Sequence, residues 1–156
     1  MQKIVPNLWF DTEAEDAAKF YTSIFSDSKI TDVSHYGEAG PREAGMVLTV
    51  SFQLQGQDFT AINGGPDFKF DEAISLLVNC ESQEEVDEFW AKLSDGGEEG
   101  QCGWLKDRYG LSWQIVPDAL IGLLQSENAE GANRAMQAML QMKKIDIAGL
   151  QKAYEG

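Results

Sequence analysis

The feature that most constrains the fold is a pattern that occurs twice along the chain. In each copy a short apolar stretch is followed by a hydroxyl residue with a glutamate three positions on, which predicts a capping box at the start of a helix. An aromatic pair then occupies the same place in each helix. The residues are Thr12, Glu15 and Phe20-Tyr21 in the first copy, and Ser82, Glu85 and Phe89-Trp90 in the second. An ordered repeat of this kind predicts one supersecondary unit used twice.

The repeated unit is predicted to be one strand, one helix and three further strands. Alternating apolar residues and turn residues give the expected boundaries. In the first copy the strands are expected at 3–10, 29–36, 46–55 and 58–63, with a hairpin turn at Gly56-Gln57. In the second they are expected at 73–80, within 98–101, and on both sides of a turn within 102–117.

The last part of the chain differs in character and reads as helical. Helices are expected at 119–125, at 132–142 and at 147–154, the last one capped by Asp146. The second of them carries a stripe of Met136, Met139 and Leu140. Such a stripe is typical of core or dimer contacts, and the alternative is an adaptable binding face.

Composition excludes several classes of partner. The formal charge of −14 disfavours nucleic acid and anionic membranes. No stretch is long and apolar enough to predict a transmembrane helix, and no signal peptide is recognisable, so a cytoplasmic protein is expected. Cys80 and Cys102 lack CxxC spacing and are interpreted as small buried apolar residues, with a disulfide or a reactive thiol as the alternative.

Several polar residues stand out against their neighbours. Gln114 lies on an apolar strand where leucine would be less costly to bury, so it is expected either to bind a ligand or to satisfy a neighbouring strand. Asn7 and Trp9 share one face of their strand. His35 is a candidate acid–base group, with a solvated side chain as the alternative. Asp107 is interpreted as a turn residue that bonds the backbone two positions on.

Long blocks of the chain resemble the vicinal oxygen chelate superfamily, which includes glyoxalase, bleomycin-resistance and dioxygenase proteins. Within it the chain is similar to the PhnB-like, demethylubiquinone methyltransferase-like subfamily. The blocks that carry the resemblance are PNLWFDTEAEDAAKFY at 6–21, FTAINGGPDFKF at 59–70, AISLLVNCESQEEVDEFW at 73–90, CGWLKDRYGLSWQIVP at 102–117 and MLQMKKIDIAGLQKAY at 139–154.

The resemblance implies an α+β fold in which two tandem βαβββ modules form curved mixed sheets around a cleft. The paired modules would occupy 1–117, divided into 1–66 and 67–117. Residues 118–156 would form a C-terminal helical extension packed on this domain or on a dimer partner. A homodimer is the expected assembly.

The resemblance also allows the superfamily's metal positions to be carried over. They fall on Gln114, near Ala73, near Val5 with Asn7 two residues along, and near Ala61 or Asn63. Most of these positions lack a metal donor, and amide oxygens alone hold a divalent cation weakly. The usual metal centre is therefore not expected, and Gln114 is the one candidate ligand for a weakly bound divalent metal.

The sequence therefore predicts a small-molecule-binding protein without an expected cofactor. The predicted ligand-binding residues of the cleft are Asn7, Trp9, Asn63, Ser75 and Gln114, while Trp104 and Trp113 are expected to close the core. The alternative is a metal-assisted lyase, isomerase or dioxygenase of the same fold. Methyltransferase activity is disfavoured, because neither Gly64-Gly65 nor Gly96-Gly97 opens a helix that could cradle a nucleotide-like cofactor.

Overall fold

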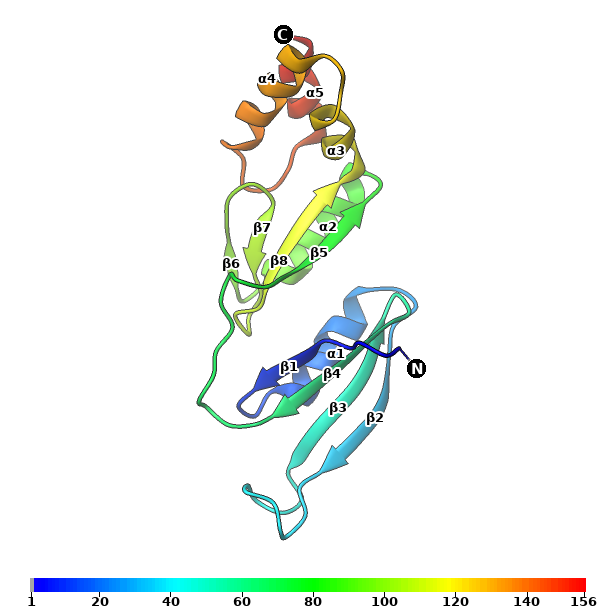
Figure 1. Ribbon diagram of the computed structural model, residues 1–156, viewed down its shortest axis with the longest axis vertical. Coiled ribbons are helices and arrows are strands. Elements are labelled where there is room, and N and C mark those ends of the chain that lie inside the picture. Colours follow the sequence, from blue (N-terminus) through cyan, green and yellow to red (C-terminus); the bar gives the residue numbers. More distant parts are fainter. Residues whose placement is uncertain (1) are drawn as a thin grey trace. The chain divides into compact units, whose positions relative to one another are not determined.

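The protein is described by a computed structural model that covers residues 2–156 (Figure 1). The chain divides into two compact units, Met1–Lys69 and Phe70–Gly156. Each unit contains a four-stranded mixed sheet with a helix on one of its faces (Figure 1). The predicted α+β fold with two βαβββ modules is confirmed.

Unit 1 contains one helix and four strands. They are β1 (Asn7–Phe10), α1 (Ala14–Ile24), β2 (Lys29–His35), β3 (Val47–Leu54) and β4 (Gln57–Asn63). The strand order is β1-β4-β3-β2, with β1 parallel to β4 and the other pairs antiparallel. Helix α1 packs on the sheet through aromatic side chains, since the Phe52 ring lies 6.3 Å from Tyr21 of the helix and stacks on Phe59 at 5.4 Å.

The hairpin between β3 and β4 turns one residue earlier than the sequence predicted. Its turn residues are Gln55 and Gly56, with φ angles of 52° and 78°. Positive φ at both positions is the backbone that best matches the twist of the two strands. The predicted turn at Gly56-Gln57 is therefore displaced by one residue, and Gln57 already belongs to β4.

Unit 2 repeats the arrangement of unit 1 and adds three helices. The module consists of β5 (Ser75–Cys80), α2 (Gln83–Ser94), β6 (Glu98–Glu99), β7 (Trp104–Lys106) and β8 (Ser112–Pro117). Its strand order is β5-β8-β7-β6, and β5 runs parallel to β8 as β1 does to β4. The internal repeat read from the sequence is thus confirmed at the level of topology.

Three helix caps were predicted, and only one forms as expected. Asp146 lies at the N-cap position of the last helix, 147–155, but its side chain makes no cap bond. The Ser82 hydroxyl accepts from the Glu85 backbone N–H at 3.2 Å, which confirms this N-cap. The prediction that Thr12 caps α1 is wrong, because Glu13 occupies the N-cap position and makes no side-chain cap bond. Instead the Oδ1 atom of Asn63, at the end of β4, accepts from the Ala14 N–H at 2.8 Å.

The C-terminal extension consists of α3 (Asp118–Leu124), α4 (Ala129–Met139) and α5 (Ile147–Glu155). It packs against the end of β8 through the buried residues Val116, Leu120, Ile145 and Leu150. Met139 packs against this cluster, whereas Leu140 of the predicted stripe is 53% exposed. Helix α4 begins earlier than predicted because the Asn128 side chain accepts from the Gly131 N–H.

A short segment before α5 attaches the extension to unit 2. The carbonyl oxygens of Met142 and Lys143 accept from the N–H groups of Cys102 and Gly103, each at 2.8 Å. The Gln83 amide of α2 donates to the Ile145 carbonyl at 3.0 Å and accepts from Ile147 N–H at 2.8 Å. Within residues 2–156, no helix is long and apolar enough to cross a membrane.

Candidate functional site

Gln114 lies on the face of the unit 2 sheet opposite α2. Its Nε2 atom donates a hydrogen bond to the Ser75 hydroxyl on β5 at 2.9 Å. In the strand register Gln114 pairs with Leu77, and Ser75 pairs with Ser112, so all four side chains project to the same side. The structure therefore brings together two of the predicted ligand-binding residues.

This face continues onto β7, where Trp104 pairs with Gln114 and Lys106 pairs with Ser112. We call the surface formed by these side chains the unit 2 face. It consists of Ser75, Leu77, Trp104, Lys106, Ser112 and Gln114. Leu77 is 51% exposed, so an apolar side chain lies open beside the amide.

Trp104 and Trp113 have different environments, contrary to the expectation that both close the core. Trp113 is 2% exposed and belongs to the core, as predicted. Trp104 is only half-buried and lies on the opposite face, beside Gln114. The alternation in Trp104-Leu105-Lys106 carried this signal, because Leu105 is buried and its two neighbours must then point the other way.

Ser112 contributes to the unit 2 face a buried hydroxyl group without a hydrogen-bond partner among the described residues. Ser112 is 1% exposed. Among residues 2–156, its Oγ is the one fully buried side-chain oxygen or nitrogen without a hydrogen-bond partner. A buried hydroxyl that is not paired carries a desolvation cost of about 1–3 kcal/mol. Such a group marks a place where a further polar partner would be favourable.

Acidic residues surround the single cation of the unit 2 face. Lys106 forms an ion pair with Glu72, and its hydrogen bond to that carboxylate raises the lysine pKa. The same contact lowers the pKa of Glu72. Glu98 lies opposite Lys106 in the register of β6 and β7. The negative charges of Glu98 and Asp71 also raise the pKa of Lys106. Three carboxylates therefore lie around one ammonium group.

The extension closes one end of the unit 2 face. Val116 follows Gln114 by two positions on β8, so its side chain projects to the same side of the sheet. It is 9% exposed because it packs in the cluster with Leu120, Ile145 and Leu150. The open part of the face therefore ends where the helices of the extension begin.

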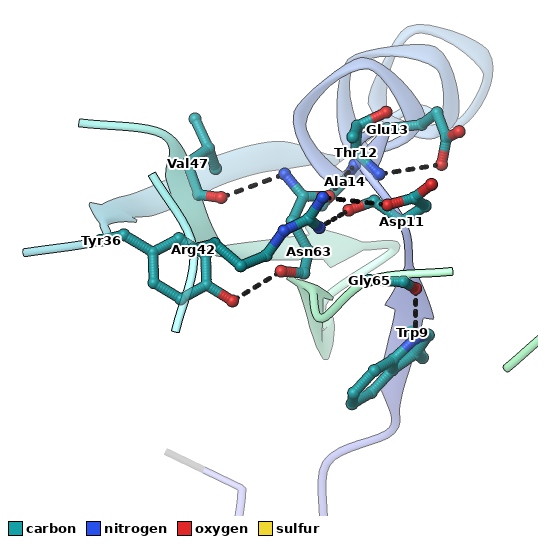
Figure 2. Close-up of polar contacts among 10 residues, drawn as sticks. All are labelled: Trp9, Asp11, Thr12, Glu13, Ala14, Tyr36, Arg42, Val47, Asn63 and Gly65. Atoms are coloured by element: carbon teal, nitrogen blue, oxygen red, sulfur yellow. Dashed lines mark hydrogen bonds and ion pairs between the residues drawn. The ribbon is translucent and has the colours of Figure 1, made fainter. Parts of the chain in front are cut away.

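Two further predicted residues lie together on unit 1. Asn7 and Trp9 project from β1 to the face opposite α1, as the sequence predicted. The Asn7 Oδ1 atom accepts from the Thr60 hydroxyl at 2.8 Å. The Trp9 indole donates to the Gly65 carbonyl at 2.9 Å (Figure 2). Its ring meets Phe68 edge-on at 4.9 Å. The polar group of Trp9 is thus already engaged within unit 1.

Asn63 lies on the other face of the same sheet and is not brought together with Asn7 and Trp9. It pairs with Phe10, whose side chain faces α1, and it is 2% exposed. Its amide accepts from Ala14 N–H and donates to the Val47 carbonyl at 3.1 Å. Its own carbonyl accepts from the buried hydroxyl of Tyr36 at 2.7 Å (Figure 2). These contacts give Asn63 a structural role at the start of α1.

The donor set does not fit a metal centre of the usual kind. Residues 2–156 contain no group of three or more His, Cys, Asp or Glu side chains placed to hold an ion. On β4 the positions that share the Asn7 face are Asp58, Thr60 and Ile62, since Ala61 is fully buried toward α1. The Asp58 carboxylate is already paired, because it accepts from the Gln53 side chain and the Gln2 N–H. Hydroxyl and amide oxygens are weak ligands by themselves. His35 is exposed at the end of β2.

Neither glycine pair forms a cradle for a nucleotide-like cofactor. Gly64 follows β4 directly, and a Cβ there would come within 2.3 Å of the Trp9 ring. This glycine is therefore explained by the close approach of an indole. Gly96 follows the end of α2 with a φ of 78°, which is the left-handed backbone common after helices. All described helices begin elsewhere.

Two βαβββ units, each with one sheet face covered by a helix, form the fold that the resemblance to the vicinal oxygen chelate superfamily implied. A family model described as 3-demethylubiquinone-9 3-methyltransferase matches residues 2–116. The chain belongs to this PhnB-like family. The match ends before α3, so the C-terminal extension lies outside it. A comparison with curated proteins gave no match.

Solved structures support the same assignment. A putative 3-demethylubiquinone-9 3-methyltransferase, the PhnB protein from Bacillus cereus, is 40% identical, covers 74% of this chain and 99% of its own, and gives a TM-score of 0.69. A protein from Pseudomonas aeruginosa, 18% identical, covers 76% and 100% with a TM-score of 0.60. The fosfomycin resistance protein FosX from Listeria monocytogenes, 15% identical, covers 80% and 98% with a TM-score of 0.58. The last two are similar in fold alone.

Proposed function

We propose that the protein binds a small molecule on the unit 2 face. The observation that carries this proposal is the placement of Gln114, an amide held by Ser75 on a partly exposed sheet face between Trp104 and Leu77. An aromatic ring, an aliphatic side chain and one oriented amide are the elements of a site for a flat, mainly apolar ligand. The unpaired hydroxyl of Ser112 supplies a second polar contact.

The name of the family describes a 3-demethylubiquinone-9 3-methyltransferase, and the unit 2 face could hold only the methyl acceptor of such a reaction. A flat aromatic ring could lie against Trp104 and Leu77. Methyl transfer also needs a site for the methyl donor, and the glycine pairs do not provide a cradle for it. We therefore propose ligand binding, with Ser75 and Gln114 as the residues that orient the ligand.

Acridine, a neutral and flat heterocycle at neutral pH, is a suitable first probe. Isothermal titration should show one site per chain, with affinity lowered at least tenfold by Trp104→Ala and by Gln114→Leu. The matched control is Gln137→Leu, the same chemical change on an exposed position of α4. Equal binding by all four proteins, or no binding to the unaltered protein, would contradict the proposal.

Two related proposals follow from the same chain and need separate measurements. Titration with S-adenosylmethionine should give no heat, whereas a stoichiometric signal would restore the methyltransferase reading. Native mass spectrometry before any chelator should show a metal-free homodimer. One metal per chain would favour a metal-assisted enzyme instead, and a monomer would contradict the predicted assembly.

A further inference from the structure

The orientation of the Gln114 amide determines which of its atoms a ligand can hydrogen-bond. One of the two N–H groups of Nε2 donates to the Ser75 hydroxyl, which leaves the second N–H and the carbonyl oxygen Oε1 for other partners. A carbonyl oxygen accepts hydrogen bonds and cannot donate them. A ligand that pairs with Oε1 must therefore carry an N–H or O–H donor, whereas a ligand with only an acceptor is limited to the second N–H of Nε2.

Ser112 provides an independent sign of a missing partner. Its buried hydroxyl has none, and the register places it between Ser75 and Lys106 on the same face. Directly opposed residues in a sheet have Cβ atoms about 4.5–5.5 Å apart. The flexible Lys106 side chain is 36% exposed, so it can move aside and let a ligand reach this hydroxyl.

The charges around the unit 2 face favour a positive ligand. Glu72, Glu98 and Asp71 act on the one ammonium group of Lys106, which leaves an excess of carboxylates. The whole chain carries a formal charge of −14, which attracts cations and repels anions at long range. An anionic ligand would have to overcome both effects.

Trp104 adds a surface that suits the same kind of molecule. The ring face of tryptophan attracts a cation electrostatically, and it also stacks on flat apolar groups. Trp104 and the exposed Leu77 flank Gln114 on the two neighbouring strands. A flat body could therefore cover the indole while its charged end points to the carboxylates.

From these observations we infer that the unit 2 face takes a flat organic cation that donates a hydrogen bond to Gln114 and pairs with the hydroxyl of Ser112. This inference rests on the proposed function and names the class of ligand for that site. The ligand's positive group replaces Lys106 as the partner of Glu72, and its apolar body lies between Trp104 and Leu77.

Three acridines of almost the same shape test the inference. At neutral pH, 9-aminoacridine is a cation, acridine is neutral and acridine-9-carboxylate is an anion. Titration at low salt should show that the cation binds at least tenfold more tightly than the anion, with acridine between them. The advantage of the cation should shrink as salt is added, because mobile ions screen the carboxylates.

Charge variants separate a local effect from the net charge of the chain. Glu72→Gln and Glu98→Gln should each reduce the preference for the cation about threefold or more. The matched control, Glu84→Gln, removes the same charge from the first turn of α2, which covers the other face of the sheet, and should leave the preference unchanged. Thermal unfolding of each variant confirms that it is folded.

The experiments distinguish a failure of this inference from a failure of the proposed binding function. If acridine binds through Trp104 but all three probes bind equally, the inference is wrong and the binding function stands. If Glu84→Gln lowers the preference as much as Glu72→Gln does, the effect comes from net charge and the inference is again overturned. If no acridine binds, both fail.

Discussion

Asn63 accepts a hydrogen bond from the backbone N–H of Ala14 at 2.8 Å, and so the last residue of β4 caps the first turn of α1. The same amide donates to the Val47 carbonyl at the start of β3. One buried side chain therefore connects the helix of unit 1 to two of its strands. The contact lies within the core, where replacement by water is not available.

We expect Asn63→Ala to destabilise the protein by about 1–3 kcal/mol, because it leaves a helix N–H and a strand carbonyl buried without partners. Asn63→Asp keeps the acceptor and should recover part of the loss. Thr12→Ala is the informative control and should have almost no effect, since Thr12 does not cap α1. Chemical unfolding measures all three variants, and a larger loss for Thr12→Ala than for Asn63→Ala would contradict the structure.

The wrong prediction at Thr12 shows that local sequence patterns do not reveal caps supplied by residues distant in the chain. The pattern of Thr12 and Glu15 fits a capping box, but Asn63 is far away in the chain and supplies the cap through a tertiary contact. The same limit applies to the faces of the sheet. Alternation showed that Asn7 and Trp9 share a side, yet only the parallel pairing of β1 with β4 shows that Asn63 lies on the other one.

Asp107 is a second buried polar residue whose bonds hold a turn. Its carboxylate accepts from the N–H groups of Tyr109 and Leu111 at 2.8 and 3.1 Å, and from the Trp113 indole at 2.9 Å. The bond to Tyr109 confirms the predicted turn role. Because Asp107 is 2% exposed, we expect Asp107→Ala to cost about 2–4 kcal/mol through lost bonds to a charged group.

The indole bond can be tested separately with a milder change. Trp113→Phe keeps most of the ring and removes the donor to Asp107, so a loss of about 1–3 kcal/mol is expected. Trp104→Phe is the matched control on the opposite face, and it should change the unfolding free energy by less than about 1 kcal/mol. Equal losses would show that the two tryptophans have the same environment, against the structure.

Gln83 makes two of the polar contacts between α2 and the extension, and the ion pair of Asp87 with Lys144 is a third. Replacing Gln83 by leucine removes the donor to Ile145 and the acceptor for Ile147 N–H. We expect hydrogen exchange at Ile147 and along α5 to become faster, and stability to fall by about 1–2 kcal/mol. Glu84→Leu, on the neighbouring exposed position, should leave the exchange of α5 unchanged.

Part of the candidate site was predicted from local sequence patterns, and the rest depends on how the strands pair, as it does for the fold. Gln114 and Ser75 stood out as polar residues on apolar strands, and the structure joins them. Trp104 was expected to close the core, and Ser112 did not stand out because a serine is unremarkable on a strand. Their place on the unit 2 face follows from the pairing of β7 with β8, which local patterns do not specify.

Cys80 provides a prediction of pH dependence. Its thiol is fully buried, and burial raises its pKa from 9.0 to about 12, with smaller effects from Glu85 and Asp118. Well below pH 9 the thiol is protonated in both folded and unfolded chains, so it adds no pH dependence there. As the pH rises from about 9 toward 12, the unfolded chain releases this proton first, and the folded state loses stability.

The Cys80→Ala variant should therefore show a smaller loss of stability over that alkaline range than the unaltered protein, whatever its stability at neutral pH. Alkylation gives a second readout, because the thiolate is the reactive form. In the folded protein at pH 8, iodoacetamide should modify the partly exposed Cys102 first, and Cys80 only when denaturant is added. Rapid alkylation of Cys80 without denaturant, or identical alkaline unfolding of the two proteins, would show that its thiol is accessible.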